Sequence, residues 1–169
     1  SPYNFYPLGF LCCCVTRVTE KSFPKMDFCS NLIIKLKQEK MSYYFTKTMD
    51  ESFDQTIEKV TEELKKEGFG ILTEIDVKET FKKKLDVDFR KYRILGACNP
   101  QMAHKAITAE SKIGTMLPCN VIVQELEDGK TEVSAVDPVA SMKAVENDSL
   151  QPIATEVREK LKKVIDNLK

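Results

Sequence analysis

The sequence predicts a single α/β domain, built as a two-layer sandwich with a mixed sheet and helices packed on it. Two observations support this class. Segments with the helical period of about 3.6 residues alternate with segments that have the strand period of two, and an Asp-Gly hairpin signal follows near the end of the chain. The predicted order is β-α-β-α-β-α-β-β-α, and such alternation is typical of a sheet covered by helices.

The sequence of the first half of this domain predicts two strands, each followed by a helix. Residues 42–48 alternate aromatic and polar side chains, as strands do. Apolar residues at helical spacing fill residues 53–64 and predict a helix that ends at Gly68. Residues 69–77 alternate again and predict a strand, after which Asp76 caps a short helix with a lysine-rich outer side.

The second half predicts the remaining three strands and two helices. Residues 92–98 form the third predicted strand, and Pro100 is typical of the first residue of a helix. Residues 121–123 predict a buried strand, and the Asp-Gly pair within residues 127–130 predicts a tight return into the last strand. A final helix is predicted from about Leu150, with one apolar stripe.

The composition is that of an ordinary soluble globular protein, since 42% of the 169 residues are apolar and 31% are charged. Lysine plus arginine balance aspartate plus glutamate at 26 each. This balance argues against a nucleic-acid partner, which needs a basic surplus. No apolar run approaches the roughly 20 residues that span a bilayer, so we predict no membrane partner. The six cysteines are not spread as in a secreted disulfide framework, and this favours a cytoplasmic protein.

Residues 1–40 keep neither period for long, and we predict that they are an extension outside the domain, either translated upstream sequence or disordered. The Gln-Glu pair shortly before Met41 can be encoded by a purine-rich bacterial ribosome-binding sequence. Met41 is therefore the predicted native start, and residues 41–169 are the single predicted domain. The alternative is a membrane-associating tail that is acylated on its cysteines.

Two Cys-Asn pairs, each beside a proline, form the most distinctive pattern in the chain. Cys98 and Asn99 end the third predicted strand, while Pro118 precedes Cys119 and Asn120 at the start of the next. Ligand sites in α/β folds favour such strand ends. A helix N-terminus directly after Cys98 is expected to lower the pKa of its thiol. We take these five residues as the candidate ligand or thiol site.

If the two thiols converge, three kinds of chemistry are open: a reversible disulfide, a thiolate metal site, or a nucleophile with a resolving thiol. Cys98 and Cys119 are the candidate metal ligands, but two thiolates are too few for a closed zinc site. His104, Glu110 or a second subunit would have to complete it. The interpretation without function is that both cysteines pack in the core, while the asparagines cap a helix and form a turn. The separation and exposure of the two sulfurs distinguish these interpretations.

Four stretches carry a likeness to a known family: EELKKEGFGILTEIDVKET, YRILGACNP, IGTMLPCNVIV and VDP. Together they resemble the domain of unknown function 302 family, and the resemblance covers Met41 to Lys169. It implies a small two-layer α/β domain that is commonly a homodimer in bacteria and archaea, without an established activity. His104 stands where the family more often has an aromatic residue, which weakens a catalytic role for His104.

We therefore expect a small dimeric binding or accessory domain with a small ligand near the two Cys-Asn pairs. The alternatives are a thiol-based redox or sulfur-handling protein and a protein that binds metal through the two cysteines. Hydrolase and phosphate-loop signatures are missing from the sequence, and this favours a protein without turnover of its own. The sequence assigns no catalytic residue and no cofactor.

Overall fold

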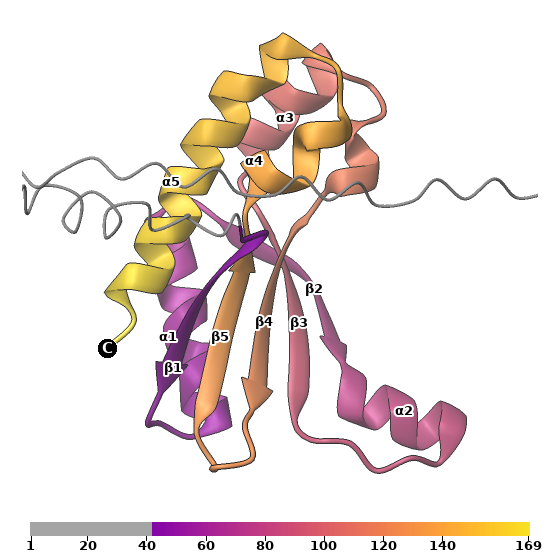
Figure 1. Cartoon of the computed structure of the whole chain (residues 1–169), viewed down its shortest axis with the longest axis vertical. Helices are drawn as coiled ribbons and strands as arrows, with labels where there is room; N and C mark the ends of the chain where they lie inside the picture. The colour runs from indigo at the N-terminus through magenta and orange to yellow at the C-terminus, as the bar shows by residue number, and fades with distance from the viewer. Residues whose placement is uncertain (1–41) are drawn as a thin grey trace, which may run out of the picture. The chain divides into compact units, whose positions relative to one another are not determined.

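A five-stranded sheet forms the centre of the domain (Figure 1). The computed structural model describes residues 42–169, so the prediction made for residues 1–40 lies outside the described residues. The strands follow the spatial order β1-β5-β4-β3-β2, and every neighbouring pair is antiparallel. Their bounds are β1 Tyr44–Met49, β2 Gly70–Asp76, β3 Tyr92–Cys98, β4 Cys119–Glu125 and β5 Thr131–Val136.

The α/β class is confirmed, but the prediction of a mixed sheet is wrong. A helix between two strands predicts a parallel pair only when the chain crosses over the sheet. The strands β1 and β2 do run parallel, yet they lie at opposite edges of the sheet with three strands between them. The other two interstrand helices, α2 (Val77–Leu85) and α3 (Pro100–Ala109), each join antiparallel neighbours and lie at the two ends of the sheet (Figure 1).

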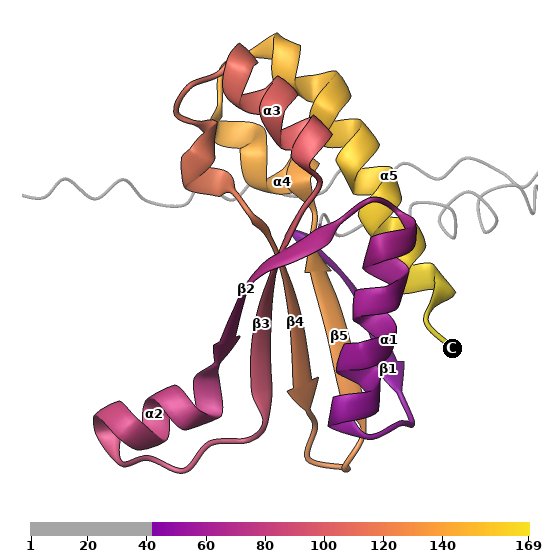
Figure 2. The same ribbon diagram turned by 180° about the vertical axis from the view of Figure 1, so that it is seen from behind.

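Helices α1 and α5 pack side by side on one face of the sheet (Figure 2). The predicted apolar stripes of both helices are buried against the strands. Leu64 and Leu161 are completely buried, and each such side chain contributes about 1.5–3 kcal/mol through its removal from water. The helices are α1 Phe53–Lys66, α2 Val77–Leu85, α3 Pro100–Ala109, α4 Pro138–Ser141 and α5 Gln151–Asn167, with 3-10 turns at Ile113–Met116, Met142–Ala144 and Asp148–Leu150.

Local sequence explains where α1 begins and ends. Ser52 occupies the N-cap position, but its hydroxyl donates a hydrogen bond to Gln55 Oε1 at 2.8 Å and makes no bond to the backbone. Ser52 and Gln55 have the spacing of a capping box, but their side chains bond to each other instead. Gly68 adopts a φ of +81° after the last turn, a left-handed conformation that glycine reaches without strain. This glycine turns the chain into β2.

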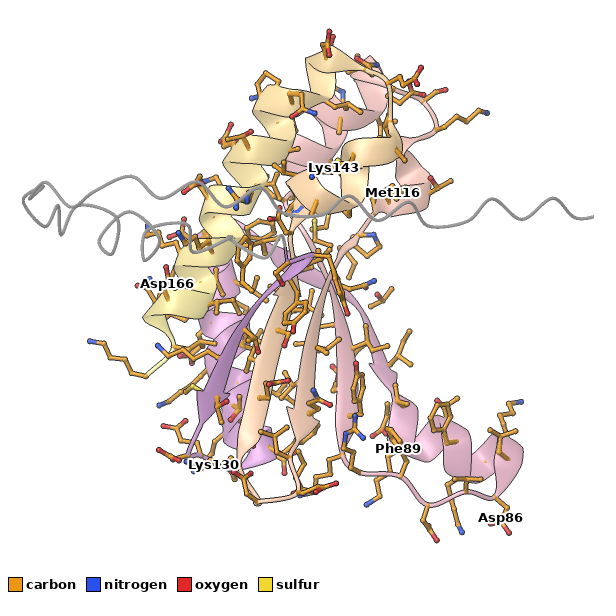
Figure 3. All side chains as sticks on the ribbon, viewed as in Figure 1. Asp86, Phe89, Met116, Lys130, Lys143 and Asp166 are labelled. Atoms are coloured by element: carbon orange, nitrogen blue, oxygen red, sulfur yellow. The ribbon has the colours of Figure 1, made fainter. Side chains whose placement is uncertain are left out.

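Helix α2 lies away from the main core, and even the side opposite its lysines is largely unburied. None of its residues is buried, and Leu85 is 66% exposed. The ring of Phe81 contacts that of Phe89. Phe89 lies on the segment that leads into β3 (Figure 3). On the outer side, Lys83 pairs with Glu79 at 2.6 Å, as expected for a solvated helix face.

The second face of the sheet carries no helix from residues 42–169 (Figure 1). Its side chains are mostly polar or aromatic, and we call it the open face. Residues that point to it include Tyr44, Thr46, Tyr92, Asn120, Ile122, Gln124, Glu132 and Ser134. None of the helices that the structure describes is long and apolar enough to cross a membrane.

Candidate functional site

The carboxyl end of β3 and the amino end of β4 meet at the end of the sheet where α3, α4 and α5 gather (Figure 1). Ala97 pairs with Cys119 across these strands, so Cys98 lies one residue beyond the partner of Cys119. Strict alternation would place the two thiols on opposite faces. Cys98 is the last residue of β3, however, and the chain turns there into α3. Both thiols consequently line one cavity.

This cavity, which we call the thiol cavity, is small and lined mainly by apolar side chains. Its volume is about 30 Å³, more than the roughly 10–15 Å³ that a cavity needs to hold one water molecule. Phe69, Leu117, Leu150, Ile153 and Val157 are among its apolar walls. No charged side chain lines it, and the amide of Asn99 is its one strongly polar group. The cavity therefore has room for a small ligand.

Asn99 stands at the rim of the thiol cavity and has a clear structural role. Its Oδ1 accepts a hydrogen bond from the backbone N–H of Met102 at 3.3 Å, which caps α3 as the sequence predicted. Pro100 follows as the first helical residue, also as predicted. The cap fixes the direction in which the chain leaves β3, and it thereby positions Cys98 against α3.

Pro118 and Asn120 do not join the other three residues of the predicted site. Asn120 is exposed and lies on the open face, because alternation along β4 points Cys119 and Asn120 in opposite directions. Pro118 packs near Gly96, where any added side chain would collide with Thr73 and Pro118. The predicted site is thus divided between the two faces of the sheet, and Asn120 is a strand residue instead of a turn former.

Burial controls the acidity of both thiols. It raises the pKa of Cys98 above its ordinary value, although this side chain is only half-buried. Burial is also the main cause that raises the pKa of Cys119 to about 11, and repulsion from a charged Cys98 adds to it. The pKa of Cys98 is thus shifted upward, opposite to the predicted lowering, because desolvation disfavours the charged thiolate. Both cysteines are free thiols.

The structure does not bring His104 or Glu110 to the two thiols. His104 is exposed on α3, and Glu110 accepts hydrogen bonds from Lys112 N and Asn147 Nδ2. Within residues 42–169 there is no group of three or more His, Cys, Asp or Glu side chains that could hold a metal ion.

Two methionines complete the sulfur content of the thiol cavity, and the sequence did not single them out. Met102 on α3 and Met142 in the turn after α4 both line it and are buried. Met102 could have been found, because it falls on the inner face of the helix that Asn99 caps. Met142 lies outside the helices and strands that the sequence predicts, and no periodic signal places it near the cysteines.

Asp137 is the one buried carboxylate among residues 42–169, and its partners give it a structural role. Its Oδ1 accepts from the backbone N–H groups of Val139 and Ala140, which caps α4. Its Oδ2 accepts from Arg158 Nε at 2.9 Å. The Asp-Pro pair thus ends β5, and Asp137 ties α4 to α5.

Comparisons with known proteins agree with this architecture. The family described as domain of unknown function DUF302 matches residues 45–168. The crystal structure of an uncharacterized conserved protein DUF302 from Bacillus stearothermophilus is similar, with a TM-score of 0.71 and 28% sequence identity. The similarity covers 76% of this chain and 100% of that one. No curated protein matches the sequence. Since the family match spans most of the chain and all the described elements from β1 to α5, the chain belongs to the DUF302 family.

Proposed function

We propose that this protein is a small binding module without turnover, and that its ligand contacts Cys98 and Cys119 in the thiol cavity. The observation that carries the proposal is the convergence of both thiols on one cavity at a strand end. Half-buried Cys98 lies on the side from which a ligand can enter, while buried Cys119 forms the inner wall. A cytoplasmic location and the lack of a nucleic-acid partner stay predictions.

A reversible disulfide between the same thiols is the second candidate, and their proximity is the observation that favours it. The negative charge of Cys98 affects the pKa of Cys119, as expected for near neighbours. The raised pKa values count against a reactive nucleophile, because the thiolate is the attacking form. Binding without covalent chemistry therefore agrees better with this cavity than thiol catalysis does.

The proposed binding function can be tested on the full chain. Four cysteines are replaced by serine, so that Cys98 and Cys119 are the only thiols that can be alkylated: Cys12, Cys13, Cys14 and Cys29. The protein isolated without oxygen is compared with the same sample after unfolding, dialysis and refolding. A bound ligand should slow the alkylation of Cys98 before this treatment and should appear as extra mass in native mass spectrometry.

The matched variants are Cys98→Ser, which should lose the ligand, and Asn120→Ala, which should keep it because Asn120 lies on the other face. Equal alkylation rates before and after refolding, with no extra mass, would contradict the binding function. Extra mass that survives Cys98→Ser and Cys119→Ala would place the ligand elsewhere.

We also propose that a second copy of the chain covers the open face, which would form the homodimer predicted from the family resemblance. The cross-strand register aligns Ile75, Ile94 and Ile122 in one row across three strands. Ile75 is 47% exposed, and Tyr43 near one end of the face is 71% exposed. Such an apolar row between polar neighbours is suited to packing against another sheet.

The charges of the open face are self-complementary. Arg90 donates to the neutral Gln124 Oε1 from Nε at 3.1 Å and from Nη2 at 2.8 Å, and no carboxylate within residues 42–169 pairs with it. Gln124 in turn donates to Glu132 Oε1 at 2.7 Å. A twofold interface uses the same patch on both copies, so Arg90 of one copy can meet Glu132 of the other twice.

Charge reversal tests this dimer. Arg90→Glu and Glu132→Arg should each shift the protein toward monomer in sedimentation equilibrium, and the double variant should restore the dimer because the pairing is exchanged. Lys83→Glu on the solvated side of α2 is the control and should leave the dimer intact. A monomeric wild type, or a dimer that both single reversals leave unchanged, would contradict this arrangement.

A further inference from the structure

The thiol cavity is lined by sulfur from four different elements. Cys98 ends β3, Cys119 begins β4, Met102 belongs to α3, and Met142 follows α4. Three of these side chains are no more than 8% exposed, and Cys98 is half-buried. No carboxylate, imidazole or amine lines the cavity. A metal ion in this cavity would have thiolates as its only anionic ligands. The only other soft donors in the cavity are thioethers.

From this set of donors we propose that the thiol cavity binds one Cu(I) ion, held by Cys98 and Cys119 and supported by the thioethers of Met102 and Met142. This assignment rests on the proposed binding function of the cavity and names its ligand. Soft thiolate and thioether sulfur is the donor type that selects Cu(I). Ca²⁺ and Mg²⁺ require oxygen ligands, and Zn²⁺ takes thiolate, imidazole or carboxylate, of which the cavity offers two groups.

The cavity is large enough for a bound ion. Its volume of about 30 Å³ exceeds the roughly 10–15 Å³ that a cavity needs to hold one water molecule. The ion must exchange its previous ligands for the protein sulfurs, and Cys98 offers the first contact because it is the more exposed thiol. The apolar walls then exclude water from the bound ion.

The binding step exchanges protons for copper. The S–H bonds of Cys98 and Cys119 break, two Cu–S bonds form, and two protons pass to solvent, while copper stays in the +1 state. The product carries one negative charge where two thiolates without the ion would carry two. The N-terminus of the ten-residue helix α3 follows Cys98 directly and favours the remaining charge.

The test is an anaerobic titration of the full chain with Cu(I), in competition with a chromophoric Cu(I) chelator. Cys12, Cys13, Cys14 and Cys29 are replaced by serine in every sample. One ion per chain and two protons released per ion are expected, with affinity that rises steeply with pH because binding displaces protons. X-ray absorption should show copper surrounded by sulfur alone.

Cys98→Ser and Cys119→Ser should each abolish this binding, whereas Met102→Leu and Met142→Leu should weaken it by roughly 10- to 100-fold, the loss typical of supporting ligands. Met116→Leu is the control, since Met116 is 39% exposed and does not line the cavity (Figure 3). Circular dichroism of each variant confirms that the fold is retained.

Two outcomes would overturn the assignment. Copper that stays bound after both cysteines are replaced would place the ion elsewhere in the chain. An unaltered chelator spectrum, with no copper bound, would exclude Cu(I) as the ligand. In that second case the proposed binding function can still hold. If the two thiols of the protein as isolated are still protected from alkylation, the cavity binds another ligand, so the two proposals can be contradicted separately.

Discussion

The two Cys-Asn pairs look alike in the sequence and differ in the structure. In the first pair both residues serve the thiol cavity, because β3 ends at Cys98 and Asn99 caps the helix that follows. In the second pair the strand has already begun, so alternation sends Cys119 inward and Asn120 to the open face. Where a strand ends, both residues of the pair therefore line the thiol cavity. Where a strand starts, the two residues point to opposite faces of the sheet.

The largest expected difference between Cys98 and Cys119 is in how much each contributes to the pH dependence of stability. Folding raises the pKa of Cys119 from the ordinary 9.0 to about 11, so the folded protein holds this proton more tightly than the unfolded chain does. The resulting stabilisation is complete below about pH 9 and is lost as the pH rises toward about 11, a change on the order of 2–3 kcal/mol. Urea unfolding across this range should show the loss.

The control for this pH effect is Cys119→Ala, which lacks the titrating thiol. The free energy of unfolding of this variant should fall less steeply above pH 9 than that of the wild type, while other alkaline titrations cancel in the comparison. Cys98→Ala should remove a smaller part of the slope, because Cys98 is only half-buried. Identical slopes for wild type and Cys119→Ala would refute the burial of this thiol.

The next difference is the cost of a hydroxyl at each cysteine. Cys119→Ser places a hydroxyl among apolar walls without a hydrogen-bond partner, and we expect a loss of about 1–3 kcal/mol in the free energy of unfolding. Cys98→Ser should cost less than about 1 kcal/mol, because water reaches this position. Denaturant unfolding at neutral pH measures both losses of stability. A larger loss for Cys98→Ser than for Cys119→Ser would contradict the burial assigned to the two side chains.

The smallest difference separates the two asparagines. Asn99→Ala removes the cap of α3 and should cost about 1 kcal/mol, while Asn99→Ser should keep most of the stability because serine also caps. Asn120→Ala should change the stability by less than about 0.5 kcal/mol in a monomer, since its side chain is exposed. Thermal unfolding of the three variants would reveal equal effects if the two asparagines were equivalent.

Much of the fold follows from local patterns in the sequence. The third strand was predicted with the bounds that the structure has, because Pro100 and Asn99 mark the start of the next helix. The hairpin between β4 and β5 was predicted from its Asp-Gly pair, and Gly129 has a φ of +79° there. These features depend on neighbouring residues, which a single sequence displays.

The features that were missed depend on contacts between distant segments. The antiparallel sheet places β1 beside β5, and no local pattern encodes which strands become neighbours. The unburied state of α2 depends on its position beyond the sheet, which its apolar spacing does not reveal. Met142 reaches the thiol cavity through the turn after α4, a path that only the folded chain defines.

The convergence of Cys98 and Cys119 on one cavity is the central claim, and a mercuric-ion titration tests it most directly. Hg²⁺ bridges two thiolates only when they lie close together. The full chain with its four other cysteines replaced by serine should take up one Hg²⁺ with the loss of two protons, and both thiols should then resist iodoacetamide in mass spectrometry. If one thiol of the mercury-loaded protein still reacts freely with iodoacetamide, the two cysteines do not share a site.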